Sequence, residues 1–421
     1  MNDLVIVFPG QGSQFPGMGK TWFDAHQSVR DRFRQASDIL GHSLEDLCFT
    51  APPGELTKTV NAQVALLVLG HSMYEVLNAE RTPPVSAMAG HSLGEITALL
   101  AAGALSFEDA VRLVKVRGEA MQLCAEENGA GMVAVLGTPV AEVEKFVAEF
   151  NAAGEGAART VQVSNYNAER QTVLSGALDD LKDVTAHLEE RGCKVARLNV
   201  GGAFHSTFMA NAVPAYVRAI ESIEFSQPTV PVYSTVTGRM YTGVQEIKDA
   251  LSVQLTGPVR WSTVVSALAD REVALWLEVG PKQVLTKLLR DAVDGGAVHS
   301  LDTEPDEAYA ALDALVERKR REPGLVGLCL GAAAATRNRN FDEQQYNDGV
   351  VLPYRQLQEL GQVDKDAVSD AQKTAALDLL TTIMTTKQVP GTEQRERIAA
   401  LLARTGDTHL RTATVAGVPA G

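Results

Sequence analysis

The sequence predicts an α/β protein in three parts: a large domain with a mainly parallel sheet, a small inserted domain, and a helical C-terminal extension. Its 421 residues are enough for two to three domains of about 150 residues each. Near Gly131 the pattern changes to a β-α-β-β-α-β order, and after Pro323 helical segments replace strands. We therefore place the large domain at residues 1–128 and 200–321, the inserted domain at 129–199, and the extension at 322–421.

The large domain is predicted from strands that alternate with helices. An apolar run ends at Pro9-Gly10, and a second run is followed at once by a glycine turn and a helical pattern. The predicted strands are Leu4–Phe8, Ser86–Ala89, Pro231–Ser234 and Leu275–Val279. The predicted helices are Ala25–Leu40, Val60–Asn78 and Lys282–Ala292. Strands separated by helices favour a parallel sheet.

The inserted domain has the element order of a ferredoxin-like fold. Its predicted strands are Met132–Leu136, Val161–Asn165, Thr172–Leu174 and Lys194–Leu198, and its predicted helices are Val140–Asn151 and Leu178–Arg191. The extension follows a charged helix at Asp306–Arg321, with further helical patterns near Gln356 and at Ala367–Thr386 and Thr392–Arg404. It carries no catalytic motif, so its role is not predicted.

Composition excludes several classes of protein. A net charge of −14 and an isoelectric point near 5.1 argue against nucleic acid as a partner, because the field would repel a phosphate backbone. The longest apolar stretch, Gly324–Ala335, is shorter than the roughly 20 residues that span a bilayer, so we expect no membrane partner. The N-terminus lacks a basic region and a cleavage site, and the four cysteines form no C-x-x-C pair. We expect a cytoplasmic protein, a monomer, with no metal.

Two glycine motifs fail on closer inspection. A phosphate-binding loop ending at Gly19-Lys20 would need a glycine where Gln14 stands. A dinucleotide-binding fingerprint that starts at Gly10 would need a glycine where Phe15 stands. Neither nucleotide hydrolysis nor hydride transfer is therefore supported.

One motif does hold. Gly90-His91-Ser92-Leu93-Gly94 fits G-x-S-x-G, in which a serine sits at a tight strand-to-helix turn and flanking side chains larger than hydrogen would clash. The turn presents the hydroxyl, and the helix N-terminus behind it offers N–H groups to a developing oxyanion. This nucleophile elbow makes the large domain α/β-hydrolase-like. The alternative is a buried serine that only caps the helix.

The order of several motifs resembles the malonyl-CoA:acyl carrier protein transacylase family, which includes free-standing enzymes of fatty acid synthesis and trans-acting acyltransferases of polyketide synthases. These motifs are FPGQGSQ from Phe8, AGHSLGE from Ala89, VRLVKVRG from Val111, GAFHS from Gly202 and EVGP from Glu278. The likeness runs from residue 4 to about residue 300 and does not cover residues beyond about 320. It implies transfer of a malonyl group from malonyl-CoA to the phosphopantetheine thiol of an acyl carrier protein through a malonyl-serine. No cofactor of the protein's own is implied.

The resemblance implies a role for each matching residue. Ser92 is the nucleophile and His205 is the base that takes its proton. The backbone carbonyl of Gln254 orients the histidine ring, and the backbone amides of Gln11 and Leu93 form the oxyanion hole. His91, beside the nucleophile, is interpreted as a packing and orienting residue.

Substrate class depends on Arg117. Read alone, it is a solvated arginine at a helix end, but in its motif it matches the clamp that binds the malonyl carboxylate through two parallel hydrogen bonds. Phe204 resembles the variant of malonyl-specific enzymes, with little room for an α-methyl branch. Asn165 and Asn167 resemble an asparagine pair that lines the cleft between the domains.

Three alternatives remain open at this point. The cargo could be a substituted malonyl group such as aminomalonyl or hydroxymalonyl. The same scaffold could instead hydrolyse stalled acyl thioesters, although a carboxylate clamp brings such an enzyme no advantage. The third alternative is a docking scaffold without activity, in which the nucleophile elbow, the histidine and the arginine would have no role. The extension is similar to those of some transacylases in polyketide or hybrid pathways, which favours that context over housekeeping fatty acid synthesis.

Overall fold

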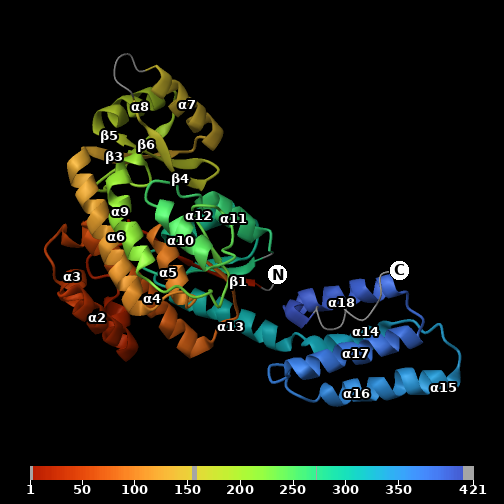
Figure 1. Cartoon of the computed structure of the whole chain (residues 1–421). Helices are drawn as coiled ribbons and strands as arrows, with labels where there is room; N and C mark the ends of the chain where they lie inside the picture. The colour runs from red at the N-terminus through yellow and green to blue at the C-terminus, as the bar shows by residue number, and fades with distance from the viewer. Residues whose placement is uncertain (1–2, 154–158, 272, 411–421) are drawn as a thin grey trace. The chain divides into compact units, whose positions relative to one another are not determined.

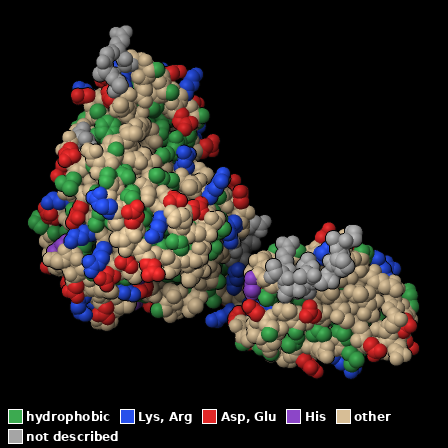
Figure 2. All heavy atoms as spheres, viewed as in Figure 1, with side chains coloured by type: hydrophobic (Ala, Val, Ile, Leu, Met, Phe, Trp, Pro, Cys, Tyr) green, Lys and Arg blue, Asp and Glu red, His purple; other side chains and the backbone are tan. Residues whose placement is uncertain are grey.

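The computed structural model describes residues 3–153, 159–271 and 273–410, and the chain divides into two compact units at residues 1–316 and 317–421 (Figure 1). The division falls inside helix α13 (Pro305–Arg321), a few residues before the expected start of the extension. On the visible face of each unit, acidic and basic side chains are interspersed (Figure 2).

A five-stranded sheet organises the first unit, with the strand order β7-β2-β1-β8-β9 and parallel pairing throughout. The strands are β1 (Asp3–Phe8), β2 (Val85–Gly90), β7 (Val232–Tyr233), β8 (Val273–Glu278) and β9 (Ala297–Ser300). The predicted parallel α/β sheet is thus confirmed. Strand β9 was not predicted, and the closer likeness to α/β hydrolases stays a prediction.

Strand β1 explains why its sequence is apolar without alternation. Leu4, Ile6 and Phe8 pack into the larger core on one face, while Val5 and Val7 pack into a second core on the other. A central parallel strand is covered by helices on both faces, so both sets of side chains are buried. The second core is closed by α11 (Trp261–Ala269) and α12 (Val284–Ala292).

The larger core contains the longest helices of the unit, α4 (Thr59–Arg81) and α6 (Phe107–Asn128), together with α5 (Leu93–Ala101). The other helices and helical turns of the large domain are α1 (Lys20–Ala25), α2 (Gln27–Leu40), α3 (Leu44–Phe49), η1 (Glu55–Thr57), η2 (Thr207–Ala212), α9 (Val213–Glu221) and α10 (Val244–Val253).

Two predicted helices begin later than expected. The helix predicted at Ala25–Leu40 starts at Gln27, because His26 has extended backbone angles that end α1 and begin α2. The helix predicted at Lys282–Ala292 starts at Val284, because Lys282 has a φ of 67°, which is outside the helical region.

The inserted segment folds around an antiparallel sheet of order β4-β5-β3-β6. Its elements follow the predicted order: β3 (Ala130–Leu136), α7 (Val140–Ala152), β4 (Gln162–Ala168), β5 (Gln171–Ala177), α8 (Leu178–Glu190) and β6 (Lys194–Arg197). Both helices and the sheet share a separate apolar core. This sheet lies at one end of the first unit (Figure 1).

The second unit is helical and has its own core. It contains α14 (Leu325–Ala335), α15 (Glu343–Tyr346), a π-helical turn at Asn347–Val351, α16 (Leu352–Leu360), α17 (Asp370–Thr386), α18 (Gly391–Thr405) and a turn at Thr408–Leu410. Helix α17 starts at Asp370, later than predicted, because Ser369 and Gln372 form a capping box there. No helix among the described residues is long and apolar enough to cross a membrane.

Candidate active site

Ser92 lies at the turn between β2 and α5, in a backbone conformation that few residues other than glycine adopt. Its φ is 53° and its ψ is −104°. A Cβ on Gly90 would lie 1.9 Å from the carbonyl of Gly94, and a Cβ on Gly94 would lie 2.0 Å from the carbonyl oxygen of Phe8. The two glycines therefore let the helix start directly behind β1 and β2, and the turn has the form of a nucleophile elbow.

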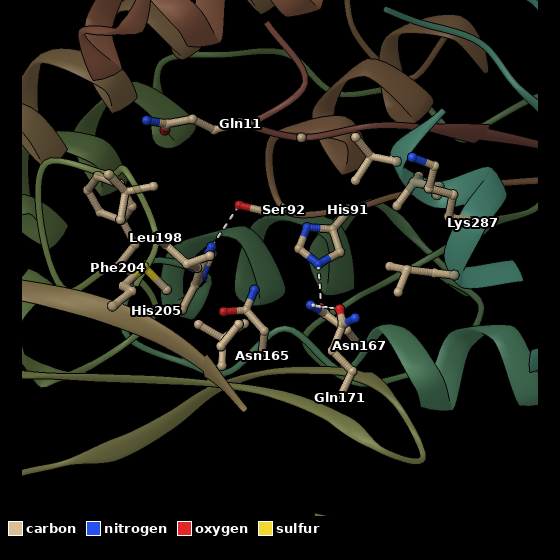
Figure 3. Close-up of a pocket in the computed structure, with 18 of the residues that line it drawn as sticks. Gln11, His91, Ser92, Asn165, Asn167, Gln171, Leu198, Phe204, His205 and Lys287 are labelled. Carbon is tan, nitrogen blue, oxygen red and sulfur yellow. Dashed lines mark hydrogen bonds between the residues drawn. The ribbon is translucent and has the colours of Figure 1, made fainter. Parts of the chain in front are cut away.

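His205 meets this serine from a loop that follows the inserted domain. Its Nε2 lies 2.7 Å from the Oγ of Ser92 (Figure 3), and its Nδ1 lies 2.9 Å from the backbone oxygen of Gln254. A carbonyl oxygen can only accept, so Nδ1 carries the ring proton and Nε2 is free to accept one from Ser92. The structure thus brings together the predicted nucleophile, base and orienting carbonyl.

The environment keeps this ring neutral. His205 is 5% exposed, and burial lowers the pKa of its imidazole to about 3, with the charge of Arg117 acting in the same direction. Desolvation disfavours the imidazolium, and a nearby cation adds to that effect. His205 also has a φ of 56°, so a second strained residue faces Ser92 across the site.

Arg117 is not a solvated arginine at a helix end, which is the interpretation that its local sequence favours by itself. It lies inside α6 and is 1% exposed, because the helix packs into the large core. Its Nη2 donates to the Oγ of Ser92 at 3.1 Å, its Nη1 to the Oε1 of Gln63 at 2.7 Å, and its Nη2 also to the Oε1 of Gln254 at 3.0 Å. Burial lowers the pKa of the guanidinium.

Sequence reasoning missed Glu95, which is fully buried beneath the site. Its Oε2 accepts hydrogen bonds from the hydroxyl of Thr235 at 2.5 Å and from the Nε2 of Gln254 at 3.0 Å, and its Oε1 accepts from the hydroxyl of Tyr241. Gln254 in turn accepts from Arg117. The available signal was an acidic residue in the first turn of a helix that is otherwise apolar and buried.

The site opens into a cleft of about 590 Å³ between the parallel sheet and the inserted domain. Figure 3 shows Asn165, Asn167 and Gln171 entering from the inserted domain opposite Ser92. Nε2 of His91 lies 2.9 Å from Oδ1 of Asn167, and the amide of Asn167 donates to Gln171. The elbow and the inserted domain are therefore linked directly through His91.

Gln11, Leu93 and Phe204 occupy positions compatible with their predicted roles. Leu93 is the first residue of α5, so its N–H has no acceptor within the helix. Gln11 and Phe204 line the cleft, and Phe204 is 5% exposed beside His205 (Figure 3). The roles themselves stay predictions.

Residues 5–315 match a family model described as acyl transferase domain. A malonyl CoA-acyl carrier protein transacylase of Bacillus subtilis is 31% identical over 404 residues, which cover 94% of this chain and 99% of that protein. The protein of the same name from Escherichia coli strain K12 is 37% identical over 314 residues, 74% of this chain and 100% of that protein. The polyketide biosynthesis protein ThaF of Burkholderia thailandensis is 39% identical over 68% of this chain, which spans only 24% of ThaF.

Solved structures also resemble this chain. The malonyl CoA-acyl carrier protein transacylase of Coxiella burnetii has a TM-score of 0.71 and 31% identity, covering 75% of this chain and 98% of that one. A malonyl-transacylase solved with its type II polyketide synthase acyl carrier protein has a TM-score of 0.69 and 33% identity, covering 75% of this chain and 99% of that one.

Proposed function

The chain belongs to the acyl transferase domain family, and from this premise we propose that it transfers a malonyl group from malonyl-CoA to the phosphopantetheine thiol of an acyl carrier protein. The 3.1 Å contact between Arg117 and the Oγ of Ser92 carries this proposal. Malonyl has a single methylene between its reacting carbonyl and its carboxylate. An enzyme for this group therefore needs its nucleophile and its cation side by side, within one cleft.

The first half-reaction forms a malonyl-serine ester. Ser92 Oγ attacks the thioester carbonyl of malonyl-CoA while its proton passes to Nε2 of His205. The oxyanion accepts hydrogen bonds from the backbone N–H groups of Gln11 and Leu93. The C–S bond then breaks, and the coenzyme A thiolate leaves with the proton that His205 returns.

The second half-reaction reverses these roles. The carrier's phosphopantetheine thiol gives its proton to His205 and attacks the ester carbonyl, and the ester oxygen of Ser92 recovers the proton as it leaves. Coenzyme A departs before the carrier thiol reacts, so the kinetics are ping-pong. Gln254 keeps the ring in one orientation throughout, because its backbone carbonyl accepts a hydrogen bond from the Nδ1–H group.

Arg117 selects the acyl group. A malonyl carboxylate that binds the guanidinium satisfies a buried cation with two parallel hydrogen bonds, whereas an acetyl or fatty acyl group offers it nothing. The same residue disfavours the editing hydrolase, because a hydrolase of mixed acyl chains gains nothing from a buried guanidinium in its cleft.

We place this activity in polyketide or hybrid biosynthesis, with the enzyme acting in trans on a separate carrier. ThaF and the transacylase solved with a polyketide carrier support that context. The cytoplasm is the proposed compartment, where the four free cysteines would stay reduced.

Covalent labelling tests the proposal. Radioactive malonyl-CoA should label the wild type and the Ser106→Ala variant, which changes an exposed helix-capping serine, but not the Ser92→Ala variant. Mass spectrometry should then show a carrier gaining one malonyl group from the labelled enzyme. Label that persists without Ser92, or a carrier that loses acyl groups instead of gaining them, would contradict the proposal.

A further inference from the structure

Lys282 is held in a strained conformation at the edge of the cleft. Its φ of 67° lies in the left-handed region, which is sterically unfavourable for a residue with a side chain. Two hydrogen bonds fix its backbone: its N–H donates to Oδ2 of Asp302 at 2.8 Å, and its carbonyl accepts from the hydroxyl of Ser300 at 2.6 Å. A strained residue persists only where its surroundings enforce it, so this position invites a functional explanation.

The side chain of Lys282 reaches the loop that follows β1. Its Nζ donates to the carbonyl oxygen of Gly12 at 3.3 Å and to that of Gln14 at 3.1 Å. The same ammonium lies 5.8 Å from the ring centre of Phe15. One lysine therefore ties the turn after β8 to the loop after β1, which is nearly the whole first unit away along the chain.

This loop carries the backbone N–H of Gln11. The carbonyl of Gly10 belongs to the same peptide group, and it accepts from the hydroxyl of Ser13 at 2.7 Å and from the N–H of Ser13 at 3.4 Å. In a trans peptide the C=O and N–H point in opposite directions. Ser13 therefore sets the direction of the Gln11 N–H, and Lys282 holds the carbonyls on either side of Ser13.

We propose that Lys282 is a positioning residue that preorganises the oxyanion loop, residues 10–14, so that the N–H of Gln11 points at the developing oxyanion. The inference rests on the proposed function for the role of Gln11, but not for the identity of the acyl group. Two of the three ammonium hydrogens are taken by loop carbonyls, so the side chain of Lys282 is committed to the loop. Lys287 is an exposed lysine that lines the same cleft.

The test measures how fast a serine-directed fluorophosphonate labels Ser92, since its phosphoryl oxygen needs the same N–H donors. Lys282→Met and Lys282→Gly should each slow labelling about 10-fold or more, as misplaced oxyanion donors do. Lys287→Met removes a lysine from the same cleft without touching the loop, and it should label at the wild-type rate. Lys282→Arg restores a cation and should recover part of the rate.

Lys282→Gly is the decisive variant, because glycine adopts this φ without strain and the turn should stay folded. Labelling at the wild-type rate in Lys282→Gly, or equal slowing in Lys282→Met and Lys287→Met, would overturn the inference. Labelling by the fluorophosphonate does not require a malonyl group. The proposed malonyl transfer and the proposed role of Lys282 can therefore be contradicted independently. A wild type that is labelled but transfers no malonyl contradicts the function alone, and the labelling rates still decide the role of Lys282.

Discussion

The guanidinium of Arg117 and the hydroxyl of Ser92 share a hydrogen bond, with Nη2 and Oγ 3.1 Å apart. Because a guanidinium can only donate, Oγ accepts this bond and its own hydrogen points to His205. A substrate carboxylate would compete with Oγ for the same donor. Binding of the acyl group and release of the nucleophile are therefore coupled through one N–H group.

Replacing Arg117 should change which acyl group is preferred. Arg117→Ala should lower kcat/KM for malonyl-CoA by about 100-fold or more, since a buried charge pair is lost, while kcat/KM for acetyl-CoA changes much less. Arg112→Ala is the matched control, because Arg112 lies on the same helix but pairs with Glu108 at the surface. A malonyl preference that survives Arg117→Ala would remove the clamp from the mechanism.

Acylation of Ser92 should be insensitive to mild acid. With the pKa of His205 lowered to about 3, the base stays neutral, so the burst rate with malonyl-CoA should be flat from pH 7.5 to about pH 5. An ordinary histidine would lose half of its base form near pH 6.5. A half-loss of the burst rate near that pH would contradict the buried, neutral ring.

The same lowered pKa of His205 predicts that stability, unlike the acylation rate, depends on pH in this range. The folded-state pKa lies below the unfolded one, so the unfolded chain takes up the proton first and the free energy of unfolding falls as pH drops from about 6.5 towards 3. His205→Asn cannot take up this proton, and it should lose less stability over that window. Chemical denaturation at pH 7 and pH 5 measures both.

The sequence predicted the parts of this site that are local. Gly90, Ser92 and Gly94 stand within five consecutive residues, so the motif is readable from the local sequence. The apolar pattern likewise predicted β1. Strand β9 was not predicted, because the four residues that follow Gly295 and Gly296 are too few to show a periodic apolar pattern.

The buried polar network was not predictable in the same way. Glu95 meets Thr235 and Gln254 across 140 and 159 residues of sequence, and Lys282 meets Gly12 across 270. No local pattern encodes such contacts, because they exist only once the strands that carry them are packed together. Arg117 was assigned through its motif alone, since its helix shows no local sign of being buried.

Glu95 should matter for both stability and rate. The carboxylate of Glu95 accepts from the N–H and hydroxyl of Thr235, the hydroxyl of Tyr241 and the NH₂ of Gln254. Glu95→Gln removes the charge and leaves one acceptor oxygen in place of two, so it should lower the free energy of unfolding by about 1–3 kcal/mol. The acylation rate should fall as well, because Gln254 loses a partner while it holds His205 and Arg117. Urea unfolding and the malonyl-CoA burst measure the two effects.

A surface carboxylate provides the control for that substitution. Glu246 accepts from the N–H and the hydroxyl of Thr242 near the surface, so it has similar partners without the burial. Glu246→Gln should stay within about 0.5 kcal/mol of the wild type and keep its burst rate. Equal stability of the two variants would show that burial of the Glu95 network contributes nothing.

Removing the second unit should leave the acylation chemistry intact. Ala308, Leu312 and Leu315 of α13 belong to the core of the first unit, whereas the core of the second contains only residues from Leu325 onward. The Escherichia coli relative, moreover, is matched over its full length by 314 residues. A chain of residues 1–321 should therefore keep the melting temperature and the malonyl-Ser92 burst of the full protein.

A shorter chain makes this truncation informative. Residues 1–304 lack α13 and with it three buried core side chains, each worth about 1.5–3 kcal/mol when fully buried, or less for the alanine, so this chain should unfold at a clearly lower temperature. If residues 1–321 prove as unstable as residues 1–304, the two cores are not independent. The chain of residues 1–321 could also form malonyl-Ser92 normally but fail to load a carrier that the full chain loads. The helical unit would then act in carrier binding and not in the chemistry. Its match to the Bacillus subtilis relative, which runs over 404 residues, would then reflect selection for that partner.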